Sequence, residues 1–248
     1  MTRVLCEVAV DSLDGVRAAE AGGADRIELC AALELGGLTP GAGLAERARS
    51  ATALPIVAIL RPRAGDFALD AQDLDVLVAE IGRLAALGID GFVAGALTPD
   101  GTVDRAAMRV LCDAVRPKPM TFHRAFDVAR DAFEALDAVC ELGTERLLSS
   151  GGAPDAESGL ATLLALGVRA GDRLELIAGG GVRAHNVARI VARSGVRAVH
   201  LSAAKVVDGP MRWRGAALRF ATHGRGPFER RITDAAEVRA TVAALREA

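Results

Sequence analysis

Short apolar runs alternate with longer amphipathic stretches along almost the whole chain. Alternation of apolar and polar residues predicts strands, because successive side chains of a strand point to opposite faces. Such runs cover residues 4–10, 26–30, 55–60, 91–97, 120–124, 146–150, 173–178 and 198–202. Helical periodicity lies between them, as at residues 69–87 and 131–142, and one more helix is expected at 233–246.

Several of the predicted helices end in the same way before the next strand. The segments AGGADRIEL, ALGIDGFVA, ELGTERLLS and RSGVRAVHL each place a glycine after the helix, where a left-handed cap favours it. Strands that alternate with helices predict a parallel α/β sheet. Eight of them in 248 residues predict a single domain, 1–248, folded as a TIM (β/α)8 barrel. An open doubly wound sheet is the alternative.

Two stretches interrupt this pattern. The glycine-rich loop AALELGGLTPGAG follows the second strand and precedes a short helix expected at residues 44–50. Residues 203–232 form a second long loop between the last strand and the final helix. Long loops in a barrel usually serve function or assembly.

Composition adds mainly exclusions. The chain has 30 basic and 32 acidic residues, which argues against nucleic acid as its main partner. No apolar run approaches the ~18 residues of a membrane span, and the first residues do not resemble a secretory signal. We therefore expect a cytoplasmic protein without membrane association. Lys118 and Lys205 are the only lysines, which leaves little room for a Schiff-base mechanism.

The alternation also predicts which polar side chains point into the barrel. With the apolar strand faces packed on the helices, the interior collects Glu7, Arg26, Glu28, Arg61, His123 and His200. Burying unpaired charges costs several kcal/mol each, so these groups must pair, meet water or bind a ligand. They lie near the carboxyl ends of strands, where barrel active sites form. A purely structural ion-pair network is the alternative.

These residue types indicate acid–base chemistry. Glu7 and Glu28 would be neighbours on adjacent strands, where like charge raises the pKa of one carboxyl. His123 would exchange a proton near neutral pH, and Asp127 in the following loop would orient these groups. The candidate catalytic residues are Glu7, Glu28, Arg61, His123 and Asp127.

Arginines and glycine-rich turns would bind an anion at the same end of the barrel. Guanidinium groups are planar forks that match carboxylate or phosphate. The segment AGGGVR ends the seventh strand and HLSA ends the eighth, where barrel loops commonly bind phosphate. The candidate substrate-binding residues are Arg26, Arg63, Arg124, Gly180, Gly181 and Ser202.

Metal motifs are few. The four cysteines are widely spaced, and no H-x-H, H-E-x-x-H or paired cysteine spacing predicts a zinc site. Cys30 is the only cysteine whose strand position would let it reach a pocket. A single thiolate with a histidine or methionine could hold Cu(I), which prefers soft ligands, although spacing alone does not indicate copper. No organic cofactor is expected.

Longer segments resemble one known family. These segments are EVAVDSLDGVRAAEAGGADRIELCAALELGGLTP, AILRPRAGDF, GALTPDGTVD, TFHRAFDVARD, SSGGAPDA and AGGGVR with HLSA. In this order, from about residue 4 to residue 204, they resemble the CutC family of copper homeostasis proteins. The resemblance implies a cytoplasmic TIM barrel that binds copper, as Cu(I), and forms a homo-oligomer, a dimer or tetramer. The family's polar motif residues correspond to Glu7, Arg26, Glu28, Arg61, His123, Arg124 and Asp127.

One position departs from the family pattern. The family's first strand commonly reads E-V-C-V and its second I-E-L-C, which places two thiols inside the barrel. Here the second is Cys30, Ala9 replaces the first, and Cys6 points to the opposite face. We therefore expect weak Cu(I) binding of low specificity. The alternatives are an enzyme of isomerase- or lyase-like chemistry on a small anion at the barrel mouth, and an interaction scaffold.

Overall fold

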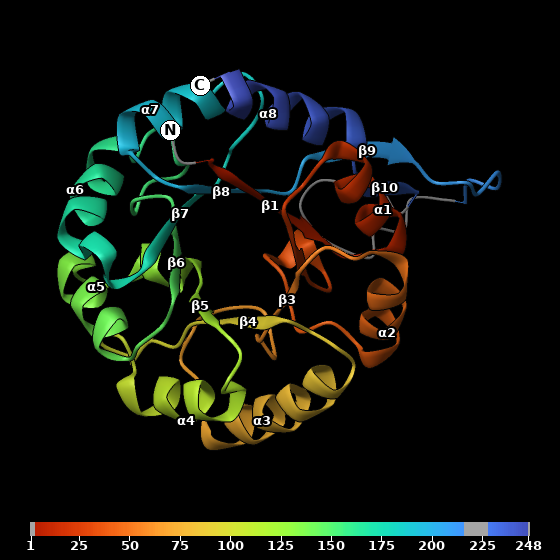
Figure 1. The fold of residues 1–248 in the computed structure, drawn as a ribbon. Helices are drawn as coiled ribbons and strands as arrows, with labels where there is room; N and C mark the ends of the chain where they lie inside the picture. The colour runs from red at the N-terminus through yellow and green to blue at the C-terminus, as the bar shows by residue number, and fades with distance from the viewer. Residues whose placement is uncertain (1–2, 216–227, 248) are drawn as a thin grey trace.

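The computed structural model describes residues 3–215 and 228–247. Its main feature is a closed barrel of eight parallel strands that follow one another in chain order (Figure 1). Strand β1 pairs with both β2 and β8, which closes the sheet and makes the open-sheet alternative wrong. The TIM barrel prediction is confirmed, with strands β1 Leu5–Val10, β2 Arg26–Leu29, β3 Ile56–Ile59, β4 Gly91–Ala94, β5 Met120–Phe122, β6 Arg146–Ser149, β7 Glu175–Gly179 and β8 Ala198–Leu201.

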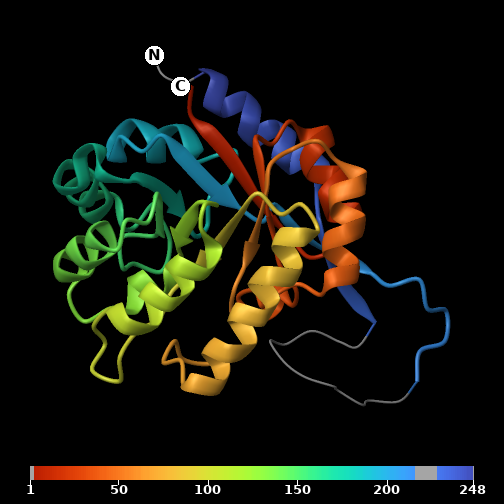
Figure 2. The same ribbon diagram turned by 60° about the horizontal axis from the view of Figure 1, so that its bottom comes forward.

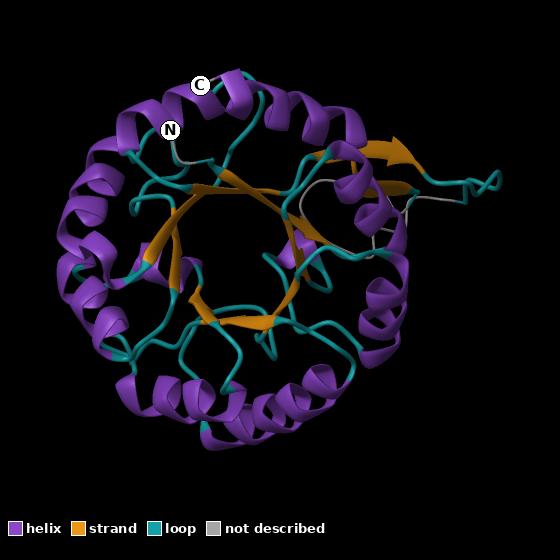
Figure 3. Cartoon of the chain, viewed as in Figure 1, coloured by secondary structure: helices purple, strands orange, loops and turns teal. Residues whose placement is uncertain are grey.

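Helices surround the barrel as an outer ring (Figure 3). Side-chain caps begin several of them, since Asp104 and Asp131 each accept hydrogen bonds from two backbone N–H groups of the first turn. No helix in the described ranges is both long and apolar enough to cross a membrane. The α-helices are α1 Leu13–Gly22, α2 Ala42–Ala51, α3 Ala71–Ala86, α4 Arg105–Val115, α5 Ala132–Glu141, α6 Leu160–Ala170, α7 Val187–Ser194 and α8 Ala235–Glu247, with short 3-10 helices at Leu33–Leu35, Arg124–Val128 and Gly171–Arg173.

The core is divided between the outer and inner faces of the sheet. The outward side chains of the strands, such as Cys6, Val8 and Val10, pack with helix residues in one large apolar cluster. Inside the barrel are two small apolar clusters, one around Val57 and Cys30 and one around Leu148 and its neighbours. Charged and polar side chains occupy the rest of the interior, as the alternation predicts.

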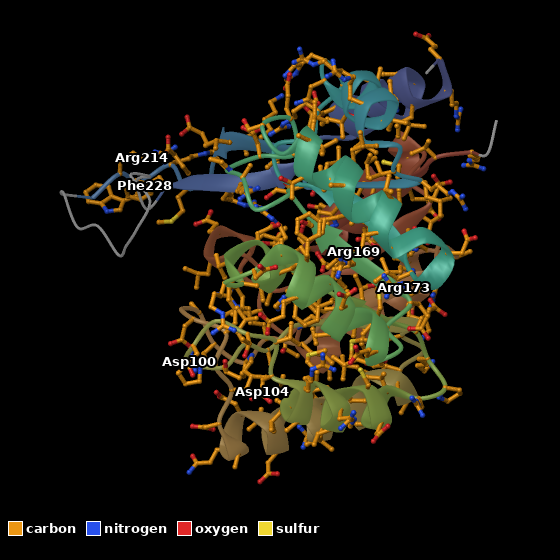
Figure 4. All side chains as sticks on the ribbon, turned by 90° about the vertical axis from the view of Figure 1, so that its left-hand side faces the viewer. Asp100, Asp104, Arg169, Arg173, Arg214 and Phe228 are labelled. Atoms are coloured by element: carbon orange, nitrogen blue, oxygen red, sulfur yellow. The ribbon has the colours of Figure 1, made fainter. Side chains whose placement is uncertain are left out.

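The segment at residues 203–232 differs from the sequence prediction, which treats it as a loop. Strands β9 Ala204–Asp208 and β10 Glu229–Thr233 pair antiparallel as a separate hairpin. Figure 2 shows this hairpin projecting beside the barrel, and residues 216–227 lie outside the described ranges. In its outer part the Arg214 guanidinium lies 4.9 Å from the centre of the Phe228 ring (Figure 4). The strands escaped prediction because β10 reads ERRIT and β9 AKVVD, without a continuous apolar face.

Candidate functional site

The loops at the carboxyl ends of the barrel strands surround a cavity of about 600 Å³. In TIM barrels this is the end at which active sites form. The cavity unites side chains from loops and strands that are far apart in the sequence. Of the predicted site residues, its wall contains Glu28, Arg61, His123, Arg124, Asp127, Gly180, Gly181 and Ser202.

Four predicted site residues are not part of this wall. Glu7 and Arg26 are buried and pair with each other inside the barrel. Cys30 is fully buried in the small apolar cluster of the barrel interior. Arg63 turns to the surface, where it pairs with Asp66 and Asp73, so the structure does not bring it to the cavity.

A row of side chains with alternating charge runs from the barrel interior to the cavity. The sheet register places Glu7 opposite Arg26 on one side and His200 on the other. Glu7 accepts a hydrogen bond from the Arg26 guanidinium, and its Oε1 lies 2.8 Å from His200 Nδ1. His200 Nε2 lies 3.6 Å from Glu28 Oε2, and both residues line the cavity.

This arrangement shifts the pKa values of Glu7 and His200 in opposite directions. Burial alone raises the pKa of Glu7, but the His200 hydrogen bond and the Arg26 charge outweigh it and lower the pKa. Burial alone lowers the pKa of His200, but the Glu7 hydrogen bond and the charges of Glu28 and Glu7 raise it. The arrangement therefore favours the carboxylate form of Glu7 and the imidazolium form of His200, with Arg26 as the second cation.

Glu28 differs from Glu7 although the two residues lie on adjacent strands. Its pKa is raised, first by burial and then by the negative charge of Glu7, with His200 opposing. The sequence predicts one raised carboxyl pKa from like charge, and Glu28 has the expected direction. Burial is nevertheless the larger cause. A carboxyl group with a raised pKa is a stronger base and a candidate for proton transfer near neutral pH.

His123 is held as a neutral donor. Its Nδ1 accepts a hydrogen bond from the backbone N–H of Ala125 at 3.2 Å, so the proton of the neutral ring lies on Nε2. Burial and the nearby Arg61 charge lower the pKa of His123 to about 4. The direction of this shift opposes the prediction that His123 exchanges a proton near neutral pH. Its buried Nε2 has no hydrogen-bond partner among the described residues.

Arg61 is anchored by the loops that follow β2 and β3. Its guanidinium donates to the carbonyl oxygens of Leu35 and Gly65 at 2.8 and 2.9 Å and lies 4.9 Å from the centre of the Phe67 ring. The same Phe67 ring lies edge-on to His123, with 5.3 Å between ring centres. Arg61 Nε is buried and, within the described ranges, lacks a hydrogen-bond partner.

The Asp127 carboxylate holds Arg124 in the cavity wall and binds two serines, so it is not available as a free base. It accepts hydrogen bonds from Arg124 Nε at 2.7 Å, Ser149 Oγ at 2.6 Å and the Ser150 N–H at 2.9 Å. Arg124 also donates to Ser150 Oγ at 2.9 Å. A Cβ atom at Gly180, whose φ is +96°, would lie 3.2 Å from the guanidinium carbon of Arg124. Glycine at this position therefore permits both the turn and the close approach.

Sequence reasoning missed two arginines of the cavity wall. Arg183 donates to the Ala204 carbonyl at 3.1 Å, and Arg231 donates to Ser202 Oγ at 2.9 Å. Arg231 belongs to β10, so it reaches the cavity only because the hairpin forms. Arg183 is the last residue of the AGGGVR segment, and that segment was the sequence feature that could have identified it. His200, identified from the sequence as an inward residue, also lines the cavity.

The donors present do not fit a preformed Cu(I) site. Cys30 Sγ lies 3.6 Å from Glu28 Oε2 and has no exposed surface. Burial and the Glu28 charge raise the pKa of its thiol well above the ordinary value, whereas a metal needs the thiolate. Ala9 faces the cavity where a second thiol would lie. Within residues 3–215 and 228–247, no group of three or more His, Cys, Asp or Glu residues could hold a metal.

Comparisons with known proteins agree with this architecture. The family model described as CutC family matches residues 4–205. A CutC family protein of Caulobacter vibrioides is 44% identical, over 98% of this chain and 98% of that protein. A human protein named copper homeostasis protein cutC homolog is 40% identical, over 95% of this chain and 86% of that protein. A crystal structure of a copper homeostasis protein CutC from Streptococcus agalactiae has a TM-score of 0.77 and 30% identity, covering 80% of this chain and 98% of that one.

Proposed function

The chain belongs to the CutC family, and from that premise we propose that it binds a small anionic ligand in the barrel mouth and transfers a proton on it. This activity is isomerase- or lyase-like. One observation carries the proposal. The same cavity has arginines on its wall, which would bind an anion, and the buried carboxyl group of Glu28, whose raised pKa suits proton transfer.

The charge of the cavity wall favours an anion. Among the described residues, the wall carries four arginines and His200, against the two carboxyl groups of Glu28 and Asp127. Asp127 is already paired with Arg124. Because the cavity is recessed, the remaining positive charge attracts an anion more strongly than it would in bulk water.

The proton-transfer role falls to Glu28. Its side chain is buried at the cavity wall, where removal from water raises the pKa and makes the carboxylate a better base. His200 lies beside it, held by Glu7, and supplies a fixed positive charge that stabilises Glu28 once the proton has been given up.

Inorganic phosphate is the first probe of the anion site. We expect phosphate to raise the melting temperature of the protein above that in chloride of equal ionic strength. Arg183→Gln should weaken phosphate binding about 10-fold, because a hydrogen bond between charged groups contributes about 1.5–3 kcal/mol. Arg109→Gln, which removes an exposed charge from α4, should leave the affinity unchanged. Equal losses in both variants, or no phosphate binding, would refute an anion site at the barrel mouth.

Copper binding is a separate expectation, because relatives are named for copper homeostasis. We expect weak Cu(I) binding in an anaerobic competitive titration, little changed by Cys30→Ala. Ala9→Cys should raise the affinity at least 10-fold, since it adds a soft ligand on the strand next to Cys30. Cys6→Ala, on the opposite face of the same strand, is the matched control. If the native chain binds Cu(I) tightly and stoichiometrically, and Cys30→Ala abolishes that binding, the expectation is wrong and Cu(I) is a ligand of this protein.

A further inference from the structure

The cavity holds two buried donor nitrogens to which the proposed function assigns no partner. Arg61 Nε and His123 Nε2 are both enclosed and lack hydrogen-bond partners in the described part of the chain. Unpaired buried donors are rare in folded proteins, since each one costs about 1–3 kcal/mol. Both side chains belong to the wall of the same cavity, and the Phe67 ring packs against both.

We infer that the ligand is a small phosphate ester that carries a carbonyl group, with its carbonyl oxygen bound by Arg61 Nε–H and His123 Nε2–H. This inference rests on the proposed function and names the substrate class of that site. A carbonyl oxygen has two lone pairs, so it accepts both hydrogen bonds at once. The Phe67 ring, partly exposed on the loop after β3, packs beside both donors.

The local structure fixes these two groups as donors. The Ala125 N–H binds His123 Nδ1, so a neutral ring presents its proton from Nε2. The Leu35 and Gly65 carbonyls hold the other nitrogens of Arg61, so Nε–H is the donor left over. Groups preorganised in this way stabilise negative charge that develops on an oxygen during reaction.

The opposite wall favours a phosphate group over a carboxylate. Arg124, Arg183 and Arg231 all line it, together with the Ser202 hydroxyl and the turn at Gly180 and Gly181. Arg124 is held in place by Asp127 and Ser150, and Arg231 by Ser202. Three guanidinium groups match the double charge and three terminal oxygens of a phosphate monoester. The loops after strands β7 and β8 are also where TIM barrels commonly bind phosphate.

The chemistry that follows is an enolisation, in which atoms and charge balance. The Glu28 carboxylate takes the proton from the carbon next to the carbonyl, so a C–H bond breaks and an O–H bond forms. The electron pair of the C–H bond becomes the new C=C bond, and the carbonyl π pair moves to the oxygen. Arg61 and His123 bind the resulting oxyanion. When the deprotonated carbon carries a hydroxyl group, return of the proton from Glu28 to the former carbonyl carbon completes an isomerisation. The hydroxyl proton passes to the first oxygen, and the deprotonated carbon becomes the new carbonyl carbon.

The test uses three probes: inorganic phosphate, malonate and 2-phosphoglycolate, whose planar carboxylate resembles an enediolate next to a phosphate group. Isothermal titration should show 2-phosphoglycolate binding at least 30-fold more tightly than phosphate. His123→Phe retains a ring without a donor and should remove most of that gain while leaving phosphate affinity unchanged. Arg183→Gln should weaken both phosphate-containing probes. His123→Phe removes an unpaired buried donor but also the acceptor of the Ala125 N–H, so chemical denaturation should confirm that the variant is folded before its affinities are compared.

The possible failures distinguish the two proposals. If phosphate binds but 2-phosphoglycolate shows no gain, or the gain survives His123→Phe, the carbonyl site is refuted and the anion site stands. If malonate binds as tightly as 2-phosphoglycolate, the assignment of the phosphate class is wrong. If neither phosphate nor 2-phosphoglycolate binds, the proposed function fails together with this inference.

Discussion

Glu7→Gln will lower the free energy of unfolding by about 3–5 kcal/mol, the usual cost of removing one partner from a buried ion pair. The glutamine has nearly the same volume, so packing is preserved. However, Arg26 and His200 lose the negative charge that lies between them. Urea denaturation of the purified variant at pH 7 measures the effect.

Glu28→Gln is the matched variant, and we expect it to cost little or to stabilise the protein. Glu28 is buried like Glu7, but burial raises its pKa and so disfavours the charged form in the folded state. Replacing that carboxyl by a neutral amide removes the penalty. A loss at Glu28→Gln as large as that at Glu7→Gln would contradict the charge assignment of the cluster.

The direction of each pKa shift determines how the stability contribution of that residue changes with pH. The folded pKa of Glu7 lies below its ordinary 4.5, so its contribution is present above about pH 4.5 and is lost as pH falls through the folded value. The folded pKa of Glu28 lies above 4.5, so its charge destabilises the protein increasingly as pH rises from 4.5 to the folded value. The raised pKa of His200 gives stability that is complete below pH 6.5 and is lost as pH rises through the folded value. The deficit of Glu7→Gln should therefore shrink in acid.

Asp127→Ala will cost about 3 kcal/mol of stability and about 10-fold in phosphate affinity. The carboxylate accepts hydrogen bonds from two serine hydroxyls, backbone N–H groups and Arg124, and its loss leaves buried donors unpaired. Phosphate affinity falls because Arg124 is no longer held against the cavity wall. Asp127 acts through Arg124, so it is a positioning residue. Chemical denaturation and phosphate titration measure the two effects.

Two further variants separate positioning from stability. Asp131→Ala removes a carboxylate that caps α5 and should cost about 1 kcal/mol without changing phosphate affinity. Asp127→Asn keeps one acceptor oxygen and should recover part of the stability, but less of the affinity, because the Arg124 ion pair is not restored. Full phosphate affinity in Asp127→Ala would show that Arg124 does not need Asp127.

The fold was predictable from the sequence because its signals are local. The period-2 alternation of each strand and the glycine after several of the helices depend only on neighbouring residues, and all eight barrel strands are found where the pattern predicts them. The same alternation correctly placed Glu7, Arg26, Glu28, His123 and His200 inside the barrel. The hairpin of β9 and β10 was missed because its two strands lie far apart in the sequence, so no local pattern indicates that they pair.

The roles of the site residues were decided by the tertiary structure. Like charges on adjacent strands suggested that one glutamate would have a raised pKa, but the register determined which one, by placing Arg26 and His200 beside Glu7. His123 is neutral because burial and Arg61 oppose its charge, and Arg231 reaches the mouth only through the hairpin. Sequence by itself determined the barrel and which polar side chains face inward, because these follow from backbone periodicity. Their charges and partners depend on through-space distances and on burial, which exist only once the barrel has closed.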